Sequence, residues 1–92
     1  MSNKLAQEII LVSSINSEKN ILSKYTNITQ IGIQGPVGLQ FTLDGEHYLN
    51  LNKTGVFELS SNIMQINSLF FRKPNENVIG NIIVDIAYEN IE

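Results

Sequence analysis

The sequence predicts an all-β protein: a small antiparallel β-sandwich, Ig-like or jelly-roll-like, with about seven short strands and at most one short helical turn. Apolar and polar residues alternate with a period of two in several segments. Turn-forming residues separate these segments at intervals of roughly 8–12 residues, and no segment keeps the period of an amphipathic helix. Ile, Leu, Val and Phe account for 32 of the 92 residues, which is enough apolar material for the core of one domain.

Two strands are expected in the N-terminal part of the chain. Glu8–Ser13 is a short apolar run that predicts the first strand, and Ile28–Gln34 alternates clearly and predicts the second. Between them, Ile21–Tyr25 fits either a strand or a helical turn. We treat residues 1–30 as an N-terminal strand and segment, a candidate attachment arm, and residues 31–92 as the β-sandwich module, within a single domain.

The stretch IGIQGPVGLQFTLDG predicts a strand, a corner and another strand. Pro36 cannot donate to a ladder, and the glycines on either side of it permit positive φ, so the chain turns there. Leu39–Leu43 alternates, the pair Asp44-Gly45 favours a two-residue hairpin turn, and Glu46–Leu51 is the return strand. Because a strand follows the corner, this glycine-rich stretch lacks the helix that a phosphate-binding loop requires.

Three more strands are expected in the C-terminal half. Val56–Leu59 and Ser68–Arg72 are short apolar runs, and Asn81–Glu89 carries the clearest alternation in the chain. Between the first two, Ser60–Asn67 has isoleucines three residues apart, which suits one helical turn capped by Ser60 or Ser61.

Catalytic and metal-binding patterns are weak. The chain has no cysteine and one histidine, His47, which follows the predicted Asp44-Gly45 turn. A general base needs an orienting partner and a nucleophile within reach, and nothing in the sequence ties them to His47, so a hydrolase is disfavoured. Asp44, Glu46 and His47 are a dense set of ligand-type residues, but a tight turn supplies too few oxygen ligands for a calcium loop. We expect no enzyme activity, no catalytic residues, no metal and no cofactor.

Charge and hydropathy limit the partners. With six Lys and Arg residues and a net charge of −3, the chain offers no basic patch for nucleic acid. The N-terminal apolar run IILV is too short for a signal peptide or a membrane span. We therefore expect synthesis in a cytoplasm without a signal peptide, with retention there or release with a particle by lysis, and no membrane insertion.

Two-sided apolar strands indicate an interface. Phe70 and Phe71 point to opposite faces if they lie in a strand, and the last strand is apolar at Ile83 and Ala87 as well as on its main face. In so small a domain, some of these side chains are expected to meet another chain, which favours a homo-oligomer or larger assembly. The alternative is a monomer whose N-terminal segment covers that face.

A carbohydrate- or receptor-binding module is a second functional hypothesis. Its candidate ligand loop comprises Gln34, Gly35, Pro36 and Gly38, with Tyr48 as a stacking residue for a surface glycan. The 12 asparagines offer a hydrogen-bonding surface for a sugar, although the excess of Asn and Ile is more simply the mark of an AT-rich genome.

The segments IGIQGPVGLQFTLDG, LNKTGVFELS, SLFF and NIIVDIAYE, in that order, resemble a module of small virion proteins. These proteins belong to phages and phage-tail-like (R-type bacteriocin-like) particles of AT-rich Gram-positive hosts. In that module the segments read IGIQ-(A/G)-P-x-G, G-(I/V)-(Y/F)-E-L and IIVD-x-x-Y-E. The resemblance spans Ile31–Glu89 and carries no catalytic residue with it.

The resemblance implies a non-enzymatic structural or accessory protein of such a particle, located in the head decoration, collar, tail or baseplate. It would act by protein–protein assembly, with other particle proteins or copies of itself as partners, and its location would be the virion or phage-derived particle. The carbohydrate- or receptor-binding module is the alternative.

Overall fold

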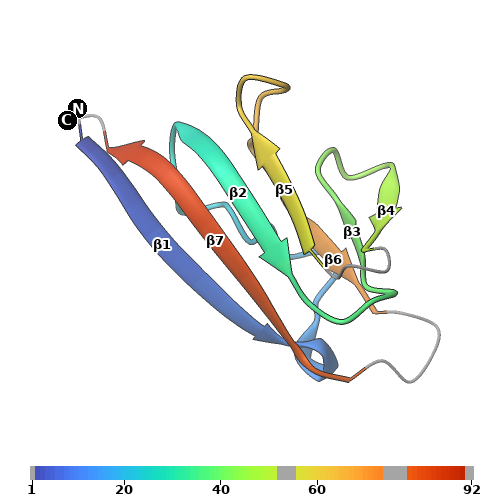
Figure 1. Ribbon diagram of the computed structural model, residues 1–92. Helices are drawn as coiled ribbons and strands as arrows, with labels where there is room; N and C mark the ends of the chain where they lie inside the picture. Colours follow the sequence, from blue (N-terminus) through green and yellow to red (C-terminus); the bar gives the residue numbers. More distant parts are fainter. Residues whose placement is uncertain (1, 52–55, 74–78, 91–92) are drawn as a thin grey trace.

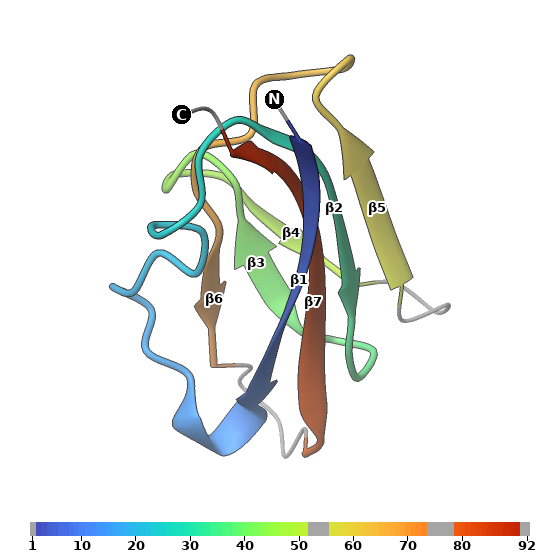
Figure 2. The same ribbon diagram turned by 90° about the vertical axis from the view of Figure 1, so that its left-hand side faces the viewer.

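The computed structural model describes residues 2–51, 56–73 and 79–90, and within them the chain is all-β, as the sequence predicts. Seven strands form two antiparallel sheets that pack face to face (Figures 1 and 2). The four-stranded sheet has the order β1-β7-β2-β5, and the three-stranded sheet has the order β4-β3-β6. The strands are β1 (Ser2–Leu11), β2 (Ile28–Gln34), β3 (Gln40–Thr42), β4 (Tyr48–Asn50), β5 (Val56–Ser60), β6 (Phe70–Arg72) and β7 (Asn81–Asn90).

The core lies between the inner faces of the two sheets. Alternate residues of β7 are buried, and in β2 the buried Ile31 and Ile33 flank Gly32, which agrees with the alternation predicted for both strands. The three-stranded sheet contributes Phe41 and Phe71, which are opposite each other in the register of β3 and β6. The centres of the Phe41 ring on β3 and the Phe57 ring on β5 lie 4.9 Å apart, so aromatic packing joins the two sheets.

The first strand is longer than the sequence predicts. It begins at Ser2 instead of Glu8 and pairs with β7 over all ten of its residues. The predicted boundary between an N-terminal segment and the sandwich module, at residue 30, falls inside β2. Residues 2–11 pair with β7 and are therefore an integral edge strand of the sheet. The apolar–polar alternation of residues 2–7 is weak because one face of this part of the strand is exposed to solvent. These residues nevertheless form a strand, because β7 provides a pairing partner of equal length.

The segment between β1 and β2 is neither strand nor helix. A single 3-10 turn, η1 (Val12–Ser14), follows β1, and residues 21–24 form a further turn. Leu22 is buried, and the Ile21 N–H donates to the Leu69 carbonyl at 2.9 Å. This segment therefore forms a side wall of the core between β1 and β2 and is hydrogen-bonded to the residue preceding β6.

Two predicted turns have a different form. β3 and β4 are joined by residues 43–47, so the two-residue turn at Asp44-Gly45 is wrong; the hydrogen bonds to Asp44 described below hold the longer loop. The predicted helical turn in Ser60–Asn67 is a plain turn, because the chain becomes extended again and Ile66 bridges to Ile28.

Candidate functional site

The outer face of the four-stranded sheet carries apolar side chains in matched pairs. On β1, Leu5 lies opposite Ala87 of β7, and Ile9 lies opposite Ile83. Leu5 is 87% exposed and Ile9 64% exposed, while Ile83 and Ala87 are half-buried. We call these four residues the apolar strip. Side chains of this kind exposed together mark an interaction surface more often than scattered single ones do.

A hollow of about 290 Å³ adjoins the strip and is lined in part by Gly32 in β2. Gly32 pairs with Asp85 on one side and with Glu58 on the other, so its missing side chain leaves a gap between two exposed carboxylates. Leu5 and Ala87 form the apolar part of the rim. The hollow thus combines an apolar wall with negative charge.

The backbone does not require a glycine at position 32. A Cβ built there would meet nothing within 4 Å, and Gly32 is not among the residues with positive φ. A glycine inside a strand costs roughly 0.5–1 kcal/mol relative to alanine. The hollow therefore exists at some expense of stability, which is the usual sign of a close approach by another group.

Only part of the predicted interface lies on this face. Ile83 and Ala87 belong to the apolar strip, but Phe70 lies on the outer face of the other sheet. Phe71 is 2% exposed and packs in the core, so it is unavailable to a partner; the choice of Phe71 as an interface residue is wrong. The missed members, Leu5 and Ile9, lie on β1, and the alternation of Leu5, Gln7 and Ile9 was the signal for them.

The predicted ligand loop is not a single site. Gln34 is exposed on the outer face of the four-stranded sheet, whereas Tyr48 lies on the outer face of the three-stranded sheet. The guanidinium of Arg72 lies 3.9 Å from the centre of the Tyr48 ring, so one stacking face of Tyr48 is already occupied.

The glycines and proline of the corner have structural roles. Gly38 has a φ of 98° and follows Pro36 in a turn closed by the Leu39 N–H donating to the Pro36 carbonyl at 3.2 Å. Gly35 allows a close approach, because a Cβ there would lie 3.2 Å from the Leu39 side chain, which would have to shift by a few tenths of an ångström.

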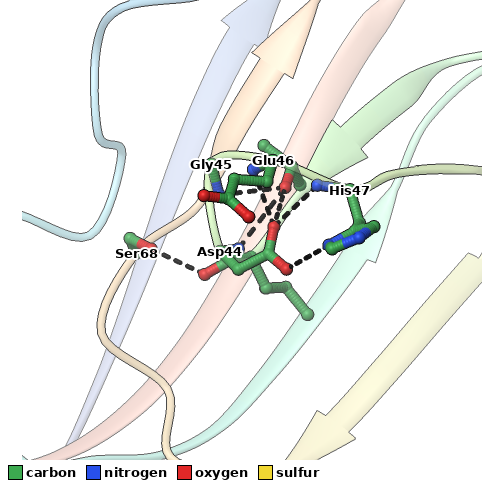
Figure 3. Close-up of polar contacts among 7 residues, drawn as sticks. Asp44, Gly45, Glu46, His47 and Ser68 are labelled. Carbon is green, nitrogen blue, oxygen red and sulfur yellow. Dashed lines mark hydrogen bonds and ion pairs between the residues drawn. The ribbon is translucent and has the colours of Figure 1, made fainter.

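Asp44 organises the loop between β3 and β4 (Figure 3). Its Oδ1 accepts hydrogen bonds from the backbone N–H of Glu46 and of His47, each at 2.8 Å. Its Oδ2 lies 2.8 Å from Nδ1 of His47. The Ser68 hydroxyl, which would be the nearby nucleophile, donates instead to the Leu43 carbonyl, on the side of Asp44 away from His47 (Figure 3). The Asp44–His47 pair therefore serves to hold the loop.

The backbone N–H of His47, followed by its side chain, holds the pKa of Asp44 well below its usual range. A carboxyl group whose pKa is lower in the folded than in the unfolded state stabilises the protein at pH values above its unfolded-state pKa. This stabilisation is lost as the pH falls through the folded-state pKa. We expect Asp44→Asn to lower the thermal midpoint at pH 7, and the difference from the wild type to shrink progressively below about pH 4. Differential scanning calorimetry from pH 2 to 7 measures this, with Glu46→Gln as the control from the same loop. A pH-independent difference would contradict it.

Comparisons with protein-family models, with curated proteins and with solved structures gave no match for this chain. Among the described residues, no group of three His, Asp or Glu side chains is placed to hold a metal ion, and no helix is long and apolar enough to cross a membrane.

Proposed function

We propose that this chain is a non-enzymatic structural or accessory component of a phage or phage-tail-like particle, and that it binds its neighbours through the outer face of the four-stranded sheet. The sequence resemblance over Ile31–Glu89 supports the kind of particle. The observation that carries the binding role is the hollow at Gly32, together with the apolar strip beside it.

The chemistry of the hollow defines what would enter it. Leu5 and Ala87 favour an apolar stem, and the carboxylates of Glu58 and Asp85 favour a positive charge at its end. The Gln7 amide donates to Asp85 Oδ1 at 2.8 Å, which fixes one of these carboxylates on the rim. A lysine or arginine side chain of a neighbouring particle protein has both properties.

The first test is the composition of the particle. We expect the chain in particles purified by density gradient from the strain that encodes it, at a fixed stoichiometry to the major structural protein by quantitative mass spectrometry. Its absence from intact particles would overturn the assignment to a particle.

Filling the hollow tests the surface. We expect Gly32→Val to stabilise the isolated domain by about 0.5–1 kcal/mol, because the strand gains a β-branched residue at a position where a Cβ meets nothing within 4 Å. We also expect it to lower incorporation into particles at least fivefold. Gln34→Val is the matched control, since Gln34 is exposed on the same strand and face but lies outside the hollow. Equal incorporation of the two variants would contradict the role of the hollow.

A further inference from the structure

In the described part of the chain β1 leaves one edge without a paired strand, and this edge differs from the other edges of the two sheets. β1 is the first strand in the order of the four-stranded sheet, so it pairs with β7 on one side only, over ten residues. The edges of the three-stranded sheet, β4 and β6, have three residues each. β5 has five residues and carries Glu58 on its outer face. Short strands and charges are the usual protection of sheet edges against pairing. β1 carries charges too, at Lys4 and Glu8, but it is the long edge strand in the ranges that the structure describes.

The backbone of β1 presents a defined set of groups at this edge. The Val12 N–H donates to the Gly80 carbonyl at 3.0 Å, and the pairing continues with Leu11 opposite Asn81. In an antiparallel ladder, residues alternate between those that bond to the partner and those that point away. The even-numbered residues of β1 therefore bond to β7, and Leu5, Gln7 and Ile9 direct their N–H and C=O groups outward.

The same three residues put their side chains on the outer face of the sheet, where Leu5 and Ile9 are exposed. The edge thus offers hydrogen-bonding groups and apolar side chains from the same positions. An antiparallel strand added there would satisfy the backbone groups and pack against Leu5 and Ile9, the β1 members of the apolar strip.

We propose that β1 pairs antiparallel with β1 of a second copy of this chain about a two-fold axis at Gln7, which joins two four-stranded sheets into one. This register sets Leu5 of each copy opposite Ile9 of the other, so the most exposed apolar residues of the edge cover one another. The inference names a partner for the proposed assembly surface and in that respect rests on the proposed function.

Charge complementarity favours a second copy in this register. Lys4 and Glu8 lie on the inner face of β1, and the register places each diagonally across from its opposite in the other copy. Within one copy the Nζ of Lys24 lies 3.1 Å from Oε2 of Glu8. Lys4 is exposed, so its ammonium group is accessible to Glu8 of the second copy. The two Glu8 side chains also lie diagonally across the axis from each other, so two Lys4–Glu8 attractions stand against one Glu8–Glu8 repulsion, which Lys24 beside each Glu8 reduces. A closed two-fold pair also uses the edge up, so it ends at a dimer instead of growing into a fibre.

Sedimentation equilibrium over a concentration series tests the dimer. We expect the double variant Leu5→Lys/Ile9→Lys to weaken the dimer at least about 100-fold, because it sets lysines of the two copies opposite each other. The matched control is Ile63→Lys/Met64→Lys, whose side chains are 76% and 42% exposed in the turn after β5, the strand at the opposite edge of the sheet from β1. A monomer at all concentrations up to the millimolar range, or equal weakening by the control, would overturn the proposal.

Amide hydrogen exchange tests the edge itself, residue by residue. In the wild-type dimer we expect protection of the N–H groups of Leu5, Gln7 and Ile9, and its loss in the double lysine variant. The N–H groups of Ala6 and Glu8 bond to β7 and stay protected in both, which also shows that the variant is folded. A dimer with rapidly exchanging odd-numbered amides would overturn the edge pairing.

The outcomes separate this inference from the proposed function. A chain that dimerises through β1 but is absent from particles contradicts only the particle role. A chain present in particles but monomeric in solution contradicts only the edge pairing.

Discussion

Phe71→Ala is expected to lower the free energy of unfolding by about 3–5 kcal/mol. Phe71 is 2% exposed and lies opposite Phe41 on the inner face of the three-stranded sheet. Truncation removes its packing and leaves a cavity that a close-packed core refills only in part. Since small domains have a total stability of about 5–15 kcal/mol, this loss is a large fraction of it. Urea denaturation followed by circular dichroism measures the change.

Phe70→Ala is the matched control, because it removes the same side chain from the adjacent residue. Phe70 is half-buried on the outer face of the same sheet, so its truncation leaves no closed cavity. We expect a loss of about 1 kcal/mol from the smaller area returned to water. Equal losses for the two variants would contradict the assignment of Phe71 to the core and Phe70 to the surface.

The two phenylalanines show what alternation predicts and what it leaves open. The sequence predicts that they point to opposite faces, but the side that faces the core depends on the position of β6 beside β3, which is a long-range property. β7 differs from β6, because its four alternating apolar residues leave only one face for the core, and that face is predicted correctly.

The candidate site depends on pairing that the sequence does not encode locally. Gly32 alternates with Ile31 and Ile33 in the sequence, but the hollow forms only because β5 and β7 place Glu58 and Asp85 beside it. Leu5 falls in a segment with weak strand character, and its exposure follows from β1 being at the edge of the sheet. The edge at β1, the hollow at Gly32 and the apolar strip all result from the register and order of the strands. The alternation within one strand therefore predicts where strands lie better than it predicts which side chains meet on the surface of the sheet.

Asn20→Ala is expected to destabilise the protein by about 2–4 kcal/mol. Asn20 lies in the segment between β1 and β2, and its Oδ1 accepts hydrogen bonds from the N–H of Leu22 at 3.0 Å and of Leu69 at 2.9 Å. Leu22 and Leu69 are both buried, so alanine would leave two backbone donors without this partner next to the core. Thermal and urea denaturation measure the loss.

Asn20→Asp separates the hydrogen-bond acceptor from the rest of the side chain. The aspartate keeps an oxygen for both N–H groups and loses only the amide donor, which reaches the Asn67 carbonyl at 3.3 Å on the exposed side. We therefore expect Asn20→Asp to cost less than about 1 kcal/mol at pH 7. If alanine and aspartate cost the same, the segment is held by the packing of Leu22 and not by the acceptor. A large difference would show that one asparagine, inconspicuous among the 12 of an Asn-rich chain, holds the side wall of the core in place.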